Sequence, residues 1–203
     1  MNYLKKIGLI AAAVAAMMAF VGASSASAAE FHTNTVGATL HGTQSGSHVF
    51  TVQGSKVTCE VASFSGKTAA LTTASQTMTP KYEKCTAFGF ANAEVNMNGC
   101  HYVFYANGTV DFICPAGKFA TIKVPTFFGS CHVDIFGSNG LKSVSYTNAA
   151  DKKTLTVHAA VKGIPYNVTT SSGGCPLTTG EGTNSEYTGT TTVTAGGATI
   201  WVE

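Results

Sequence analysis

The residues of this chain that could do chemistry are its six histidines and ten acidic residues, in a sequence without arginine. His132 and Asp134 are two residues apart, so on a β-strand they would share one face and offer a nitrogen and an oxygen to a metal ion, with His101 as a third candidate. Side chains at that spacing stand ~7 Å apart, and a shared ion would need ligands from other strands. We therefore expect no metal site and no cofactor.

Paired carboxylates could act as the acid and the base of a secreted polysaccharide hydrolase, but their separation decides that chemistry and the sequence does not set it. Recognised hydrolase motifs are missing, including Gly-x-Ser-x-Gly, Ser-x-x-Lys and His-Glu-x-x-His. A catalytic role is therefore the less favoured interpretation, and no catalytic residue is assigned. As isolated acids, the following are expected to be solvated surface charges: Glu60, Glu83, Glu94, Asp111, Asp134 and Asp151.

The six cysteines all follow an N-terminal apolar segment, and an even number of cysteines in an exported chain is typical of disulfides. Thirteen residues lie between Cys100 and Cys114, the closest pair, whereas a zinc site would need a much shorter spacing. Six cysteines allow about fifteen pairings. If Cys100 pairs with Cys114, the arrangement without crossing connections joins Cys59 to Cys85 and Cys131 to Cys175.

Residues 98–115 give the sharpest structural prediction, a β-hairpin around Asn107 and Gly108. A two-residue Asn-Gly turn would place a charged residue on the same face as the aromatic residues, so that neither face of the hairpin would be apolar. We therefore predict a three-residue loop with Gly108 in the left-handed bulge position. This register sets two cysteines opposite each other, close enough for a disulfide, and gathers six residues on one face: Cys100, Tyr102, Phe104, Val110, Phe112 and Cys114.

Residues 1–28 have the pattern of a secretory signal peptide. Lys5 and Lys6 precede an apolar run from Ile7 to Val21, and the small residues of 26–28 resemble a cleavage site. The run of about 15 residues is shorter than the ~20 that a membrane-spanning helix needs. We expect residues 29–203 to be one secreted, extracellular domain that has no membrane partner after cleavage.

Charge excludes a nucleic-acid partner for the mature domain. Cleavage would remove two of the twelve lysines and no acid, which leaves ten lysines against ten acidic residues. The net charge is then near zero, and arginine, which most often reads guanine edges and holds phosphates, is absent. The oligomeric state is not indicated.

Short runs of alternating polar and apolar residues recur after residue 30, with Gly, Asn and Ser between them and no helical periodicity. Such a pattern predicts an all-β fold, a disulfide-stapled antiparallel β-sandwich or a barrel-like meander. Besides the hairpin, we expect strands at 48–53, 56–64, 69–73, 77–85, 93–97, 119–124, 130–136, 142–147, 154–162, 165–169, 186–194 and 198–202.

Two segments are expected to be exposed loops that could bind a partner. Phe127 and Phe128 are adjacent, so they cannot both face the core of one strand, and we expect at least one of them to be exposed. The stretch from Gly173 to Tyr187 is rich in Gly and Thr and is predicted to be a long loop. Trp201 lies in an apolar terminal run and is expected to cover the core or a strand edge.

The chain resembles a group of uncharacterised secreted bacterial proteins, apparently actinobacterial, over most of its mature length. The resemblance implies a secreted, cysteine-paired β-rich protein and carries no activity or site residue. The segments that carry it are Asn98-Gly99-Cys100-His101-Tyr102, Cys114-Pro115-Ala116-Gly117, Cys131-His132-Val133-Asp134-Ile135, Val144-Ser145-Tyr146-Thr147-Asn148, and the closing blocks Tyr187-Thr188-Gly189 and Ile200-Trp201-Val202-Glu203.

Two functions from different classes follow from these observations. The favoured one is a non-catalytic β-domain with a binding or structural role at or beyond the cell surface, whose partner is a cell-envelope glycan or a surface protein. A flat or grooved patch around Phe127 and Phe128 would support it. The alternative is a secreted hydrolase, which two carboxylates, or a histidine and an acid, in one pocket would support.

Overall fold

The computed structural model describes residues 28–203, so the predicted signal peptide, apart from Ala28, lies outside the described residues. The described chain has sixteen β-strands and no helix, which confirms the all-β prediction. The strands are β1 (Phe31–Thr33), β2 (Thr39–Gln44), β3 (His48–Val52), β4 (Ser55–Lys67), β5 (Thr72–Thr73), β6 (Ser75–Ala87), β7 (Ala91–Asn96), β8 (His101–Tyr105), β9 (Thr109–Ile113), β10 (Ala120–Thr126), β11 (Gly129–Ile135), β12 (Ser138–Lys142), β13 (Val144–Asn148), β14 (Thr154–Ser171), β15 (Gly180–Thr194) and β16 (Ile200–Val202).

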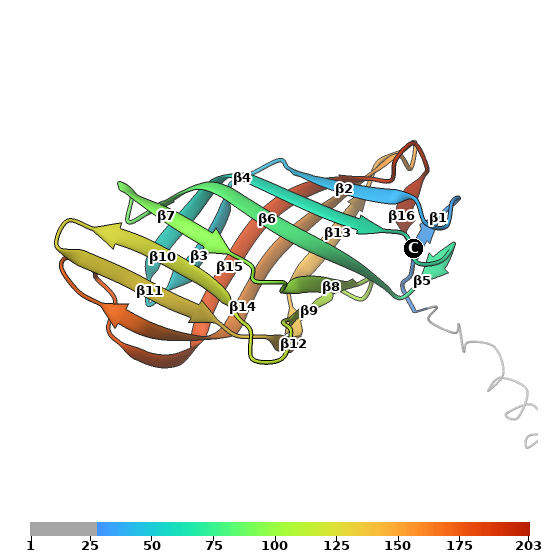
Figure 1. The fold of residues 1–203 in the computed structure, drawn as a ribbon. Helices are drawn as coiled ribbons and strands as arrows, with labels where there is room; N and C mark the ends of the chain where they lie inside the picture. Colours follow the sequence, from blue (N-terminus) through green and yellow to red (C-terminus); the bar gives the residue numbers. More distant parts are fainter. Residues whose placement is uncertain (1–27) are drawn as a thin grey trace, which may run out of the picture.

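Thirteen strands form one antiparallel sheet that closes on itself, so the fold is a barrel rather than a sandwich of two sheets. The closed ring runs β3, β4, β6, β7, β10, β11, β14, β15 and back to β3. It lies at the left of the elongated molecule (Figure 1). Closure pairs the edges that an open sheet would expose.

Four long strands, β4, β6, β14 and β15, continue beyond the ring, where β2, β8, β9, β12 and β13 join them. With 18 residues, β14 spans about 60 Å at ~3.3 Å per residue, nearly the length of the barrel. Its register shifts twice around Gly163, whose φ is 80°, and Pro165. A bulge suits proline, which has no N–H to give to a sheet.

A small sheet of β16, β1 and β5 covers the end of the barrel at the right of Figure 1, and we call it the cap. The two ends of the described chain meet in it, because the Glu30 amide donates to the Glu203 carbonyl at 2.8 Å and the Glu203 amide donates back at 3.1 Å. The opposite end of the barrel is therefore the one far from both termini.

The central hairpin has the predicted register. Tyr102 pairs with Phe112 and Phe104 with Val110, and Gly108 has a φ of 87°. The Gly108 amide donates to the Tyr105 carbonyl at 3.1 Å, which closes the three-residue loop. Four of the six residues of the predicted apolar face are buried, and Phe104 and Cys114 are partly buried against the core.

All three predicted disulfides are confirmed. The first joins β4 to β6, the second closes the base of the central hairpin, and the third ties the segment after β14 to β11. The cap has none. The pairs are Cys59–Cys85, Cys100–Cys114 and Cys131–Cys175.

Several predicted boundaries are wrong. Residues 180–187 of the predicted Gly173–Tyr187 loop belong to β15, where they pair with β3 and β14, so the loop is only 172–179. The strand predicted at 142–147 is broken by Ser143, whose φ is 79°. The strands predicted at 154–162 and 165–169 are one bulged strand, and in the segment 69–73 only residues 72 and 73 are extended. Strands β1, β2 and β12 were not predicted.

Candidate binding surface at the barrel tip

Phe127 and Phe128 form the turn between β10 and β11. Thr126 pairs with Gly129, which leaves the two phenylalanines as the whole connection. Their side chains are 96% and 86% exposed, and their ring centroids lie 5.6 Å apart. The prediction that at least one of them is exposed is therefore confirmed, since both are.

The segment after β14 holds this turn in place. The Thr126 hydroxyl donates to the Gly173 carbonyl at 2.6 Å, and the Ser130 amide donates to the Ser172 hydroxyl at 3.1 Å. The two backbones touch, since a Cβ on Gly173 would overlap the backbone of Phe128. The Cys131–Cys175 disulfide fixes the same segment covalently. The turn is thus presented on a rigid support.

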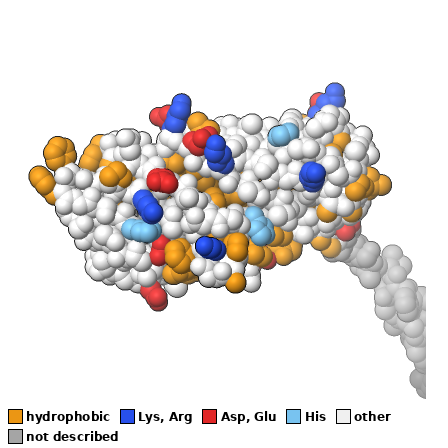
Figure 2. Space-filling model, in the orientation of Figure 1, with side chains coloured by type: hydrophobic (Ala, Val, Ile, Leu, Met, Phe, Trp, Pro, Cys, Tyr) orange, Lys and Arg blue, Asp and Glu red, His pale blue; other side chains and the backbone are white. Residues whose placement is uncertain are grey.

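Phe90 is exposed on the adjacent hairpin, and sequence reasoning missed it. It follows Phe88 and Gly89, both with positive φ, in the turn between β6 and β7, and its side chain is 83% exposed. Since β7 pairs with β10, the two aromatic turns come from neighbouring hairpins. We call Phe90, Phe127 and Phe128 the aromatic tip; apolar side chains project at this end in Figure 2. The missed signal was Phe-Gly-Phe between two strands.

The tip end of the barrel is uncharged. Four turns meet there: residues 53–54, 88–90, 127–128 and 172–179. None of their residues is acidic or basic. The first charged side chains after these turns along the chain are those of Lys56, on β4, and Glu181, on β15, each two residues beyond a turn. The surface around the tip therefore combines bare aromatic rings with amides, hydroxyls and backbone.

An open groove of about 650 Å³ runs along the outside of β4 and β6 beside the tip. Phe88 and Pro176 are among the residues that line it, and Lys56 and Glu60 supply its charges. A second open pocket, of about 350 Å³, contains Glu94 and Lys81. Neither pocket contains two carboxylates or a histidine, the arrangements expected of a hydrolase.

His132 and Asp134 share a strand face, as predicted, and His132 Nε2 lies 3.2 Å from Asp134 Oδ1. The prediction that Asp134 is a solvated surface charge is wrong, since the residue is only 6% exposed between Thr121 of β10 and Asn167 of β14. Burial raises the pKa of its carboxyl above the usual range, against the opposing charges of His132 and Lys123.

The remaining candidates do not join this pair. His101 is on β8, which β6, β7 and β10 separate from β11 in the sheet. Asp111 accepts hydrogen bonds from the Tyr105 hydroxyl at 2.9 Å and the Gly140 amide at 2.6 Å, so it orders the hairpin locally. Within residues 28–203, no group of three or more His, Cys, Asp or Glu is placed to bind a metal ion.

A chain of hydrogen bonds between buried side chains crosses the barrel interior, and no sequence motif predicts it. The hydroxyls of Tyr102 and Tyr82 are 3.3 Å apart, Tyr82 donates to Tyr187 at 2.9 Å, and the Tyr187 hydroxyl is 2.6 Å from His48 Nδ1. His48 Nε2 is 3.1 Å from the Thr190 carbonyl, which can only accept, so Nε2 carries the proton and Nδ1 accepts from Tyr187.

Burial controls the protonation of this chain. It lowers the pKa of His48 below its ordinary value, although the hydrogen bond to Thr190 opposes the shift. It raises the pKa of Tyr102 to about 12 and that of Tyr82 and Tyr187 well above the ordinary range. All four groups are therefore neutral at pH 7, as a buried polar network requires.

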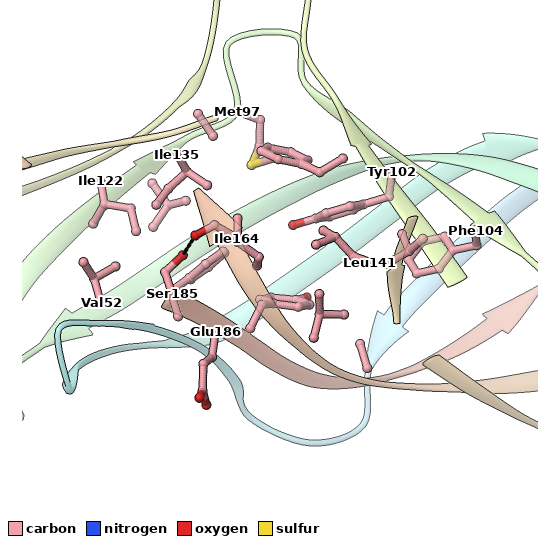
Figure 3. Close-up of a pocket in the computed structure, with 18 residues that line it drawn as sticks. Val52, Met97, Tyr102, Phe104, Ile122, Ile135, Leu141, Ile164, Ser185 and Glu186 are labelled. Atoms are coloured by element: carbon pink, nitrogen blue, oxygen red, sulfur yellow. Dashed lines mark hydrogen bonds between the residues drawn. The ribbon is translucent and has the colours of Figure 1, made fainter. Parts of the chain in front are cut away.

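Two small cavities flank the aromatic chain, of about 30 and 40 Å³. In the first, apolar side chains converge while the labelled Glu186 carboxylate points away (Figure 3). Such volumes admit one or two waters, whereas a bound small molecule needs roughly 300 Å³ or more. The interior is thus a packed core without room for a small-molecule ligand.

No protein-family model, curated protein or solved structure matches this chain. Residues 28–203 contain no helix with the length and apolar character of a membrane span. The functional assignment therefore depends on the geometry described above.

Proposed function

We propose that this protein is a secreted, non-catalytic β-domain that binds a component of the cell surface or envelope, and that the aromatic tip is its contact surface. The observation that carries the proposal is the exposure of three phenylalanines on neighbouring turns, at 83%, 96% and 86% for Phe90, Phe127 and Phe128. Large apolar side chains exposed together on adjacent turns are typical of an interaction site.

The energetics support the same assignment. Burying a phenylalanine side chain is favourable by about 1.5 to 3 kcal/mol relative to leaving it in water. At the tip this free energy is unused in the folded chain and is available to a partner. The closed barrel and the Cys131–Cys175 disulfide hold the turns before binding, so little conformational entropy is lost on association.

The proposal is tested by binding of residues 29–203, which contain every strand of the fold, to isolated cell-envelope fractions. We expect saturable binding that weakens at least tenfold in F127A/F128A. The matched control is V36A/L71A, which removes apolar side chains that are 56% and 53% exposed on loops beside the cap. Equal binding by all three proteins would refute the tip as the contact surface.

A second outcome would favour the hydrolase. Multiple-turnover cleavage of an envelope polysaccharide, abolished by D134N or H132Q and unaffected by F127A/F128A, would replace the binding assignment with an enzymatic one. Those variants are chosen because His132 and Asp134 are a histidine and a buried acid in contact, at 3.2 Å.

A further inference from the structure

We propose that the partner of the aromatic tip is a lipid surface, into which Phe90, Phe127 and Phe128 insert while the barrel stays in water. This inference rests on the proposed function and names the chemistry of its ligand. It revises the sequence-based expectation of no membrane partner, because the contact is peripheral and reversible.

The shape of the tip favours insertion over docking in a groove. The three rings stand free of the protein and line neither open pocket, since Phe88, rather than Phe90, lines the nearby groove. A projecting apolar side chain is best buried by a deformable partner that can surround it. The interfacial region of a bilayer does so and accepts apolar groups to a depth of about 5 to 10 Å.

The absence of charge favours the same partner. No residue of the four turns at this end is charged, so insertion would not bury a charge in a medium where that is costly. Lys56 and Glu181, each two residues beyond a turn, belong to strands and would stay at the level of the headgroups.

The polar side chains nearest the rings are engaged in hydrogen bonds within the protein. The hydroxyl of Thr126, next to Phe127, is already donated to the Gly173 carbonyl at 2.6 Å. A stacked glycan would need several free hydrogen-bonding side chains converging with the aromatic faces. Gln53 and Ser172, on two of the other turns, are likewise bonded to backbone groups.

The size of the apolar surface favours a lipid partner over a protein partner. Three phenylalanines bury roughly 450 to 750 Å² in total, at ~150 to 250 Å² each. A stable protein interface needs about 800 Å² from each partner, including a well-packed centre. For an interfacial anchor the smaller area is enough, since its affinity grows with the apolar area inserted.

The orientation of the molecule is compatible with this contact. Both ends of the described chain lie in the cap, at the other end of an elongated barrel (Figure 1). With the tip in the lipid, the long axis stands away from the surface and the cap faces water. No strand has to leave the barrel for the rings to reach the lipid.

Vesicle flotation of residues 29–203 tests the proposal, because residues 1–28 include an apolar segment that would itself bind lipid. The probes are vesicles of phosphatidylcholine alone and with phosphatidylglycerol. We expect saturable binding to both, with little dependence on salt because the tip is uncharged. The variant F90A/F127A/F128A should lose at least tenfold in affinity, and V36A/L71A should bind as the parent does.

A leucine variant distinguishes a lipid partner from a glycan partner. F90L/F127L/F128L keeps apolar side chains but removes the aromatic faces, so it should float with vesicles within a few-fold of the parent. If the parent binds envelope fractions but no vesicle, and the leucine variant binds neither, the tip stacks on a glycan and the lipid assignment is overturned while the proposed function stands.

The other outcomes are equally decisive. Binding to neither envelope nor vesicles overturns both proposals. A tip-dependent dimer by light scattering, without flotation, assigns the surface to a second copy and overturns the lipid assignment. Each variant is first shown to have the circular dichroism spectrum and melting temperature of the parent, so that a loss of flotation reports on the tip.

Discussion

Aromatic side chains are covered at the cap end of the barrel and exposed at the tip end. At the cap, Phe31 is buried edge-on against Tyr146, with ring centroids 5.2 Å apart. Trp201 is covered by the stacked ring of His32 at 5.2 Å and by Lys152 Nζ at 4.2 Å from its centroid. At the tip, three phenylalanines have no such cover.

The cap shows that aromatic rings at an end of this barrel can be covered by neighbouring side chains. The cap closes its end with short strands and with side chains that lie over the indole of Trp201. The turn of residues 127–128 is held by hydrogen bonds to the segment after β14 and by the adjacent Cys131–Cys175 disulfide, yet its rings point outward. Exposed rings are therefore not a by-product of loose structure, which is why we assign them to binding.

Reduction of the disulfides should have the largest effect, and it should act on the tip end rather than on the cap. Each bridge contributes on the order of 3 to 4 kcal/mol in the loop-entropy model, and the cap contains none. Denaturant unfolding with and without reductant should show a large loss, and hydrogen exchange should show the 172–179 segment opening first. An unchanged midpoint after verified reduction would mean that the β-core suffices alone.

Removing one ring at each end gives the next contrast. Phe31→Ala should lower the free energy of unfolding by about 3 to 5 kcal/mol, because it empties a packed site. Phe127→Ala should change it by less than about 0.5 kcal/mol, as expected for an exposed residue. Urea titration of both variants measures the difference. Similar losses would show that the tip is part of the core.

Two adjacent glycines test how the tip turn is supported. A Cβ at Gly173 would overlap the backbone of Phe128, whereas one at Gly174 meets nothing within 4 Å. Both have positive φ, of 53° and 95°, so G174A controls for backbone strain. We expect G173A to cost ~1 to 3 kcal/mol more than G174A in thermal unfolding and to weaken envelope binding as well. Equal effects would argue against the packing.

The smallest effect concerns His48, which lies between the two ends. Its pKa is lowered in the folded state, so the unfolded chain binds a proton more readily as the pH falls through about 6.5. The stability from neutral His48 is therefore complete above that pH and declines below it. Stability measured from pH 7.5 to 5.5 should fall in the parent and fall less in His48→Gln. Parallel slopes would remove His48 as the cause.

Local patterns predicted the parts of the fold that depend on local chemistry. The register of the hairpin followed from Gly108 and from the alternation of Tyr102 and Phe112, and the Cys100–Cys114 disulfide followed from that register. The other two disulfides followed from the arrangement without crossing connections. The predicted strand boundaries were wrong where pairing with a distant strand determines which residues are extended. Residues 180–185 are polar and glycine-rich, and they are extended because β14 supplies their hydrogen bonds.

The candidate site was only half predictable for the same reason. Phe127 and Phe128 are adjacent, which forces exposure in a two-residue turn, but Phe90 joins them only through the pairing of β7 with β10. The chain from Tyr102 to His48 brings together residues separated by up to 139 positions. No spacing rule connects such residues before the barrel closes.

The most direct test of the central claim is a fluorescent reporter at the tip. The chain has one tryptophan, so F127W in a W201F background places the only indole on the tip turn, and L71W/W201F places it beside the cap. On addition of saturating envelope fraction, the account predicts a blue shift and protection from acrylamide quenching for F127W alone. A shift for L71W alone, or an unshifted F127W in a sample shown to be bound, would contradict the assignment of the aromatic tip as the contact surface.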